Sequence, residues 1–209
     1  MAGREPAGPV VVLATTNAKK LVELRRLVAE AGAEVRVLGL GDLEPYPEPA
    51  ETERTFVGNA LLKARACVAA TGLPALADDS GIAVDVLNGM PGVRSARWSG
   101  PDATDERNNA LLLAQLDDVA DDDRTAHFEA AVALVLPDGT ERTTTGRMAG
   151  RLLRAPVGDN GFGYDPLFVA DGQQASNGEL DAPAKDRISH RGQAVRAMVP
   201  VLLEELAKG

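Results

Sequence analysis

Two adjacent aspartates, Asp78 and Asp79, interrupt the apolar stretch PALADDSGIAVDVL, residues 74–87. Neighbouring like charges repel, and a polar turn needs only one acid followed by Gly or Asn. The pair is therefore a candidate for chemistry that uses negative charge. Together with Glu51, the aspartates offer oxygen ligands to a hard cation such as Mg²⁺. The chain has one cysteine and no cluster of histidines, which argues against zinc.

A second candidate is the stretch ATTNAKKLVEL, residues 14–24, which follows a short β-branched strand. It places Thr15, Thr16 and Asn17 in a turn and Lys20 at the start of a helix. Unpaired N–H groups and the helix dipole favour an anion at such a position, so a phosphate would fit. Neither GxxxxGK[ST] nor GxGxxG occurs, so an ordinary capped helix with a solvated lysine remains the alternative.

The glycine-rich segment GDNGFGYDP, residues 158–166, carries Phe162 and Tyr164 in a chain with only 3% aromatic residues. Rings in such a loop are well placed to stack on a flat ligand such as a nucleobase, with Asp165 beside them. The alternative is a glycine turn whose rings fold back onto the core.

A further candidate is the cationic segment AKDRISHRGQ, residues 184–193. Lys185 lies upstream of an expected helix start, and His190 and Arg191 fall in the first turn after Ser189, a possible cap. Cations are disfavoured at a helix N-terminus, so His190 and Arg191 make sense there if they share an anion with the exposed N–H groups. Surface side chains that point away are the alternative.

The elements that must position these residues alternate between helix and strand. Strands are expected at residues 10–14, 35–38, 128–136 and 141–146, with a further strand in which Ile82, Val84 and Val86 share one face. Helices are expected from Leu21 to about Gly32, after caps at Thr55 and Thr104, and from Ser189 to the end, where Pro200 should bend or divide the helix. The signal Pro137-Asp138-Gly139 predicts a hairpin, so we expect an α/β protein with a mixed sheet.

Composition sets the remaining limits. With 209 residues, 44% apolar and 25% charged, the chain is expected to form one soluble domain, residues 1–209, with residues 1–9 as a flexible tail. The net charge of −9 argues against nucleic acid and anionic membranes as partners. We expect a cytoplasmic protein because secretory and membrane-spanning patterns are absent from the sequence. Cys67 reads as a small core residue, Trp98 as partly buried, and the acidic run at 116–124 as solvated surface.

Six segments together resemble a known family. TTNAKK, ETERTF with NALLKAR after it, ADDSGIAVDVL, PGVRSARWSG, FGYDP and SHRGQ occur in the order found in the non-canonical purine nucleoside triphosphate pyrophosphatases of the inosine triphosphatase type. The resemblance spans about Val10 to Leu206. It implies an elongated mixed β-sheet with flanking helices, two lobes around a central cleft, and a homodimer. It also implies Mg²⁺-dependent hydrolysis of ITP, dITP and XTP to the monophosphate and pyrophosphate.

The resemblance also implies roles for individual residues. Asp79 matches the catalytic acid, expected to be the general base for the attacking water and a metal contact. Asp78 adds negative charge beside it, and Glu51 matches the other metal-binding carboxylate. The phosphate loop matches Thr15, Thr16, Asn17 and Lys20, further substrate contacts match Lys63 and Ser80, and base-side contacts match Phe162, Gly163, Tyr164, Asp165, Lys185, His190 and Arg191.

Two other functions remain open at this point. A non-catalytic nucleotide sensor would use the same phosphate loop and aromatic side chains but would not need three carboxylates placed for a metal and a base. A Maf-like pyrophosphatase would share the general architecture and would prefer dTTP or UTP to ITP.

Overall fold

The computed structural model describes residues 8–16, 18–30 and 34–208. The chain divides into two compact units, and strand β3, Ala75–Val84, passes from one to the other between Asp79 and Ser80. The first unit comprises residues 1–79, 131–144 and 194–209, and the second comprises residues 80–130 and 145–193. Within the described part of the chain, no helix has the length and apolarity needed to cross a membrane.

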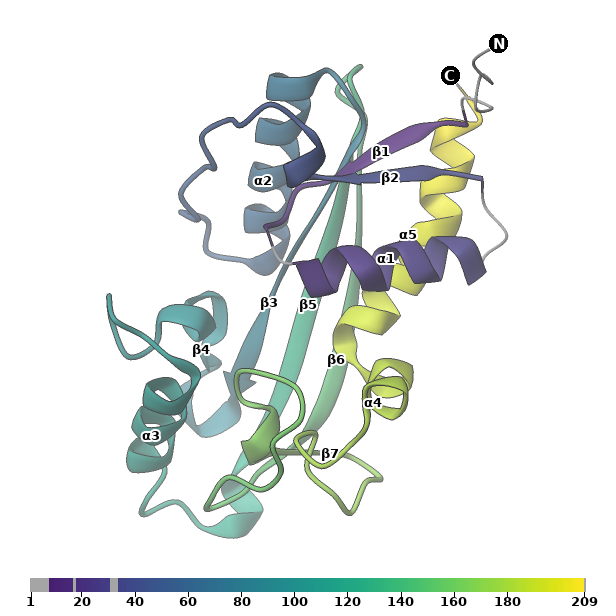
Figure 1. Ribbon diagram of the computed structural model, residues 1–209. Helices are drawn as coiled ribbons and strands as arrows, with labels where there is room; N and C mark the ends of the chain where they lie inside the picture. The colour runs from purple at the N-terminus through teal and green to yellow at the C-terminus, as the bar shows by residue number, and fades with distance from the viewer. Residues whose placement is uncertain (1–7, 17, 31–33, 209) are drawn as a thin grey trace. The chain divides into compact units, whose positions relative to one another are not determined.

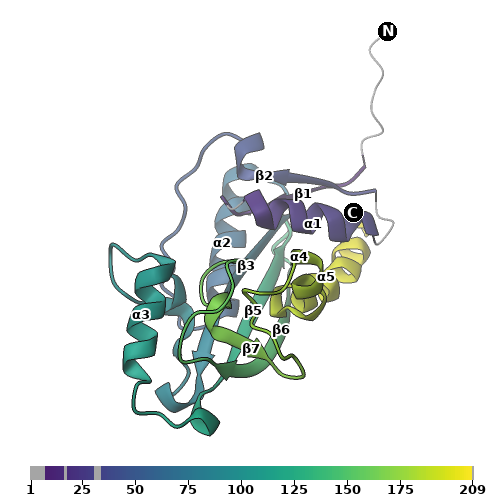
Figure 2. The same ribbon diagram turned by 60° about the horizontal axis from the view of Figure 1, so that its bottom comes forward.

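The first unit is built on a parallel arrangement of strands (Figure 1). β1, Val10–Leu13, pairs in parallel with β2, Arg36–Gly39, on one side and with β3 on the other. Helix α1, Ala18–Glu30, connects β1 to β2 and lies beside β2 (Figures 1 and 2). Helix α2, Phe56–Thr71, begins at Thr55, whose side chain accepts a hydrogen bond from the Gly58 N–H, and ends at Gly72 in the left-handed conformation.

The second unit carries the loops and short helices that follow β3. Its elements in chain order are η2, Asp85–Leu87; β4, Met90–Pro91; η3, Gly92–Arg97; α3, Asp105–Gln115; η4, Asp121–Asp123; η5, Asp165–Leu167; β7, Phe168–Ala170; and α4, Ala182–Ile188. The long hairpin strands β5, Thr125–Val135, and β6, Glu141–Leu152, contribute to both units. Helix α5, His190–Leu206, starts in the second unit and ends in the first. A core cluster that includes Ile82, Phe128 and Phe168 holds the second unit together.

The mixed sheet predicted from the sequence is confirmed. Its strands run in the order β2-β1-β3-β5-β6-β7, with β4 paired to β3, and both β3–β4 and β6–β7 are antiparallel. The predicted hairpin at Pro137-Asp138-Gly139 is also present, because the Gly139 N–H donates to the Leu136 carbonyl. The sheet therefore combines parallel strands near β1 with antiparallel strands beyond β3.

Several local expectations were wrong or incomplete. Val86 does not share a face with Ile82 and Val84: β3 ends at Val84, and Val86 lies in η2 and is 47% exposed. Pro200 does not divide the last helix, because α5 continues through it. Lys185 lies within α4, a helix that the pattern did not predict and whose N-terminus is capped by Asp181. Cys67 is fully buried, as expected.

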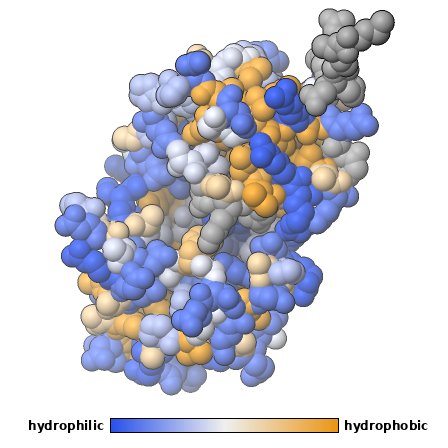
Figure 3. All heavy atoms as spheres, in the orientation of Figure 1, coloured by the Kyte–Doolittle hydropathy of each residue, from blue (hydrophilic) through white to orange (hydrophobic). Residues whose placement is uncertain are grey.

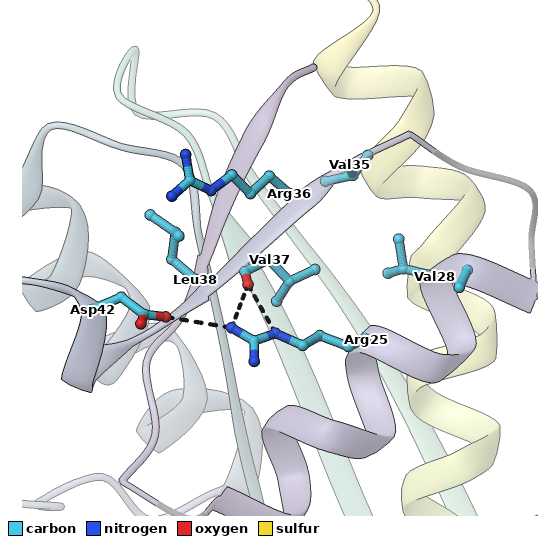
Figure 4. A pocket seen from close by; sticks show the side chains of 8 residues that line it. Arg25, Val28, Val35, Arg36, Val37, Leu38 and Asp42 are labelled. Carbon is cyan, nitrogen blue, oxygen red and sulfur yellow. Dashed lines mark hydrogen bonds and ion pairs between the residues drawn. The ribbon is translucent and has the colours of Figure 1, made fainter. Parts of the chain in front are cut away.

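The outer edge of the sheet in the first unit is closed by side chains (Figure 4). β2 pairs only with β1 in the strand order, so alternate backbone groups of β2 point away from the sheet. The Arg25 Nε and Nη2 both donate to the outward carbonyl of Val37, at 3.0 and 2.9 Å. Asp42 Oδ2 accepts from the Gly39 N–H at 2.9 Å and pairs with Arg25 at 3.3 Å. Apolar residues gather on the surface where β1, β2 and α1 lie (Figure 3), so this edge adjoins an apolar surface.

Candidate active site

A cavity of about 250 Å³ in the first unit collects most of the residues predicted to handle phosphate and metal. Its walls come from the turn after β1, the segment 40–51, α2 and β3. The lining residues are Ala14, Thr15, Thr16, Lys20, Leu40, Tyr46, Glu48, Pro49, Glu51, Lys63 and Asp78. Asn17, the remaining residue of the predicted phosphate loop, lies outside the described residues.

The two adjacent aspartates of β3 pair with lysines from different helices. Lys20 Nζ, from the start of α1, lies 2.7 Å from Asp78 Oδ2. Lys63 Nζ, from α2, lies 3.3 Å from Asp79 Oδ1 and 3.0 Å from Glu51 Oε1. Asp78 and Asp79 are only 6% and 9% exposed, so each carboxylate depends on these partners for the solvation that water no longer supplies.

Asn59 is a further residue of this cluster that sequence reasoning missed. Its Nδ2 donates to Asp79 Oδ2 at 3.0 Å, and its Oδ1 accepts from the Glu53 N–H. Asn59 is fully buried and lies one helical turn before Lys63 on α2. The i, i+4 spacing of the two residues in NALLKAR is the signal that would have placed both on one face of the helix.

The pKa values of this cluster reflect burial first and the neighbouring charges second. Burial raises the pKa of Asp79, Lys63 and Asn59 oppose that rise, and Glu51 adds to it, leaving the pKa above its ordinary value. Burial lowers the pKa of Lys63, but Asp79, Glu51 and Asp78 outweigh it and leave this pKa raised. In the ion pairs seen among the described residues, the three carboxylates Asp78, Asp79 and Glu51 meet the two ammonium groups of Lys20 and Lys63. The cluster therefore has room for additional positive charge.

This arrangement fits a divalent cation held jointly with a substrate. Glu51 and Asp79 converge on one ammonium group, which shows that both carboxylates can face the same cation. Among the described residues, no group of three or more His, Cys, Asp or Glu side chains is arranged to hold a metal by itself. Mg²⁺ in particular is commonly bound through one or two carboxylates plus substrate phosphates. The donor set is thus suited to a metal that arrives with a phosphorylated ligand.

A second cavity, of about 130 Å³, lies in the second unit and collects the predicted base-side residues. It is lined by residues of the second half of β3, η3, α3, β5, the glycine-rich loop, α4 and the start of α5. These residues are Ser80, Gly81, Ser95, Ala96, Asp105, Asn108, Phe128, Phe162, Gly163, Tyr164, Asp165, Lys185, His190 and Arg191.

Phe162 presents an exposed ring to this cavity with cations close to it. The residue is 45% exposed, and Lys185 Nζ and Arg191 Cζ lie 4.7 and 5.5 Å from the ring centroid. Lys185 also pairs with the buried carboxylate of Asp165, and Arg191 Nη2 donates to Ser80 Oγ at 2.9 Å. An aromatic face beside two donor-only side chains suits a flat ligand that carries hydrogen-bond acceptors.

Tyr164 and His190 play a different part from Phe162. Tyr164 is 4% exposed, belongs to the core cluster, and donates from its hydroxyl to the Ser95 carbonyl at 2.8 Å. The Tyr164 ring thus folds back onto the core, as the alternative reading of this loop predicted, while the residue also lines the second cavity. His190 is also buried and stacks on Phe128, with ring centroids 4.9 Å apart. Ser189 caps α5 as expected, because its Oγ accepts from the Gly192 N–H.

Comparison with known proteins identifies the family. The model of the Ham1 family matches residues 11–201. The chain belongs to the Ham1 family. Among curated Ham1 relatives, a protein of Cutibacterium acnes named dITP/XTP pyrophosphatase is 57% identical over 198 residues, covering 94% of this chain and 97% of the relative. A protein of Frankia alni with the same name is 59% identical over 201 residues, covering 94% and 98%.

Solved structures of Ham1 proteins share the fold. A HAM1 protein from Coxiella burnetii is 40% identical, with a TM-score of 0.87 over 94% of this chain and 99% of that chain. A nucleoside-triphosphatase, dITP/XTP pyrophosphatase, from Mycobacterium abscessus is 49% identical, with a TM-score of 0.79 over 92% and 99%. The mixed α/β fold is thus that of the Ham1 proteins.

Proposed function

We propose that this protein hydrolyses non-canonical purine nucleoside triphosphates such as dITP, ITP and XTP to the monophosphate and pyrophosphate. The observation that carries the proposal is the convergence of Glu51 and Asp79 on Lys63, within a chain whose Ham1 relatives are named dITP/XTP pyrophosphatases. In this assignment the first-unit cavity serves the triphosphate and the second-unit cavity serves the base.

The carboxylates of the first unit divide the chemical work between metal binding and proton transfer. Mg²⁺, when bound, would be held by Glu51 and Asp79 and would neutralise charge on the phosphates. Asp79 is the general base that orients and deprotonates the attacking water, and Asn59 fixes its carboxylate for that task. Asp78 raises the local negative charge that retains the metal. Phosphoryl-group chemistry depends mostly on such positioning and electrostatic stabilisation.

The lysines of the first unit stabilise the leaving pyrophosphate. Lys20 at the start of α1, and the neighbouring Thr15 and Thr16, offer donors where the helix dipole also favours an anion. Lys63 balances the Glu51 and Asp79 carboxylates and would be able to donate to phosphate oxygens if these carboxylates held a metal. An anchored donor of this kind is typically worth about 3 kcal/mol in the transition state.

The second-unit cavity supports selection of the base. A purine stacked on Phe162 would have Lys185 and Arg191 within reach, and both side chains donate hydrogen bonds without accepting any. A 6-oxo group satisfies such donors, whereas the amino group of adenine leaves them unpaired. A mismatch of this kind can reject a substrate by about 10⁴.

Product analysis tests the proposed reaction. The protein is offered ITP, XTP, ATP, GTP and dTTP separately with Mg²⁺, and pyrophosphate is measured apart from orthophosphate. Pyrophosphate from ITP and XTP, with little from ATP, is the expected result. Orthophosphate release would place the attack at another phosphorus, binding without product would favour a sensor, and preference for dTTP would favour a Maf-like activity.

The assembly and location follow as accompanying proposals. We infer a homodimer and a cytoplasmic protein, with a small-molecule nucleotide rather than nucleic acid as partner, as the family resemblance and the net charge of −9 suggest. Light scattering coupled to size-exclusion chromatography measures the mass directly. A mass near one chain, 21.9 kDa, would contradict the dimer.

A further inference from the structure

The exposed ring of Phe162 lies between glycines, in a loop that Tyr164 anchors in the core. Gly158, Gly161 and Gly163 all have positive φ values, 84°, 78° and 61°, a conformation that glycine adopts without strain. Glycine also leaves the backbone free to take many other conformations. The position of the Phe162 ring must therefore be fixed by contacts that the loop backbone makes with other elements.

Helix α3 supplies two such contacts, both to Gly163. Asp105 Oδ2 accepts from the Gly163 N–H at 2.6 Å, and Asn109 Nδ2 donates to the Gly163 carbonyl at 3.0 Å. The two side chains are one helical turn apart on α3, so they project from the same face. Together they bind the N–H and the carbonyl of Gly163, the residue that directly follows Phe162.

The environment of the two residues indicates what each contributes. Asn109 is 8% exposed, and its Oδ1 has no hydrogen-bond partner among the described residues. A buried unpaired oxygen costs free energy, so packing stability alone does not explain an amide here. Asp105 is the first residue of α3, directly after the N-cap Thr104, where the helix dipole favours a carboxylate.

On the other side of the loop, the Phe162 backbone is tied to the base-side residues. Asp165 Oδ2 accepts from the Phe162 N–H at 2.9 Å and also pairs with Lys185. Asn177 Nδ2 donates to Asp165 Oδ1 at 3.3 Å. The loop is thus held by Asp165 and by α3, and both Asp165 and Asp105 line the cavity, whereas Asn109 is not among its lining residues.

We propose that Asp105 and Asn109 are positioning residues that set base selectivity by clamping Gly163 and thereby fixing the Phe162 ring. The inference deepens the proposed function and rests on it for the identity of the base. Asn109 is not among the residues that line the base-side cavity whereas Asp105 is, so Asn109→Ala tests the clamp apart from a direct contact with the nucleotide. The clamp acts through hydrogen bonding, so an acceptor at position 105 matters more than its charge.

Hydrogen exchange tests the clamp without reference to activity. Amide exchange is followed by mass spectrometry on peptides that cover residues 158–166 in the full-length protein. Asp105→Ala should raise exchange in this segment, whereas Asp105→Asn, which keeps an acceptor for the Gly163 N–H, should raise it far less. Glu106→Gln removes an equal charge from the same turn and serves as the control. Equal exchange in Asp105→Ala and the wild type would overturn the clamp.

Discrimination between ITP and ATP tests whether the clamp on Gly163 sets base selectivity. Loss of one hydrogen bond to a charged group corresponds to about a tenfold change or more, so Asp105→Ala should lower kcat/KM for ITP by about that factor, mainly through KM. Asn109→Ala removes a hydrogen bond between neutral groups and should lower kcat/KM by a smaller factor. The ratio of kcat/KM for ITP over ATP should fall with it, a ratio that partial unfolding cannot change. In a Phe162→Ala background, Asp105→Ala should add little.

The outcomes separate the two proposals. A wild-type protein that releases no pyrophosphate from ITP contradicts the proposed function, and the exchange experiment then still decides on the clamp. An active wild type whose ITP-over-ATP ratio is unchanged by Asp105→Ala contradicts the role in selectivity. An equal effect of Asp105→Ala with and without Phe162 would do so as well, because the clamp acts through that ring.

Discussion

The partners of Asp79 allow a buried carboxylate to act as a base. Asp79 is held by an amide donor and an ammonium group, both from α2, and lies in the interior strand β3. A buried carboxylate without such partners would be protonated instead of serving as a base. The residue types were readable from the sequence, but Asn59, which orients Asp79, was not singled out, because its i, i+4 spacing to Lys63 is informative only once Lys63 is known to lie beside Asp79.

Asp79→Asn should abolish turnover while nucleotide binding persists. Asparagine has nearly the same shape, and its oxygen can still accept from Asn59 or Lys63, so the local packing survives. Loss of a general base typically lowers the rate by about 10²–10⁴. Steady-state pyrophosphate release and isothermal titration with ITP measure the two properties. Asp117→Asn, at an exposed position of the acidic run, is the matched control. Near-normal turnover would remove Asp79 from the role of base.

At the scale of elements, periodicity predicted the helices and the hairpin well and β3 poorly. Alternation of apolar and polar residues identifies strands that have one solvent-exposed face. In β3, however, nine of the ten residues are buried, all except Ser80. An interior strand covered on both faces loses the alternation, which is why Val86 was added to it in error. Helix α4 escaped prediction because it spans only seven residues, too few for a periodic pattern. The convergence of Glu51, Lys63 and Asp79 depends on contacts between distant segments. The residue types indicated that Glu51 could join the aspartates around a cation, and the family resemblance alone added Lys63.

The cap on the β2 edge leads to a prediction about association. Arg25→Ala should free the Val37 carbonyl and leave a strand edge open beside an apolar surface, which favours pairing with another chain. Faster aggregation at high protein concentration, followed by light scattering, is the expected result. Arg25 and Asp42 are both half-exposed, so the free energy of unfolding should change by no more than about 1 kcal/mol.

A neighbouring arginine provides the comparison for this edge effect. Arg26→Ala removes the same charge from α1, but the ion pair that it breaks, with Glu30, lies within that helix. It should leave aggregation at the wild-type rate. If both variants aggregate equally fast, net charge rather than the uncovered edge is responsible. If neither does, the Arg25 cap does not protect β2.

At the scale of the whole molecule, thermal stabilisation by a nucleotide analogue should depend on residues of both the first-unit and the second-unit cavity. An ITP analogue with a methylene bridge between the α- and β-phosphorus resists cleavage and binds only the folded state. At about 100 times its Kd it should stabilise the protein by about 2.7 kcal/mol. For a chain of this length, 1 kcal/mol shifts Tm by about 2–4 °C, so Tm should rise by about 5–11 °C. Differential scanning calorimetry measures the shift.

The composition of the ligand mixture then tells which cavity contributes. With EDTA in place of Mg²⁺ the shift should largely disappear, because the excess carboxylates around Lys63 repel a triphosphate that arrives without a metal. With the ATP analogue and Mg²⁺ the shift should be smaller, because Lys185 and Arg191 meet an amino group. Phe162→Ala should reduce the shift with the ITP analogue towards the value for the ATP analogue. If the Tm shift is the same with and without Mg²⁺ and the same for the ITP and ATP analogues, the first-unit cavity does not bind the metal–triphosphate and the second-unit cavity does not select the base.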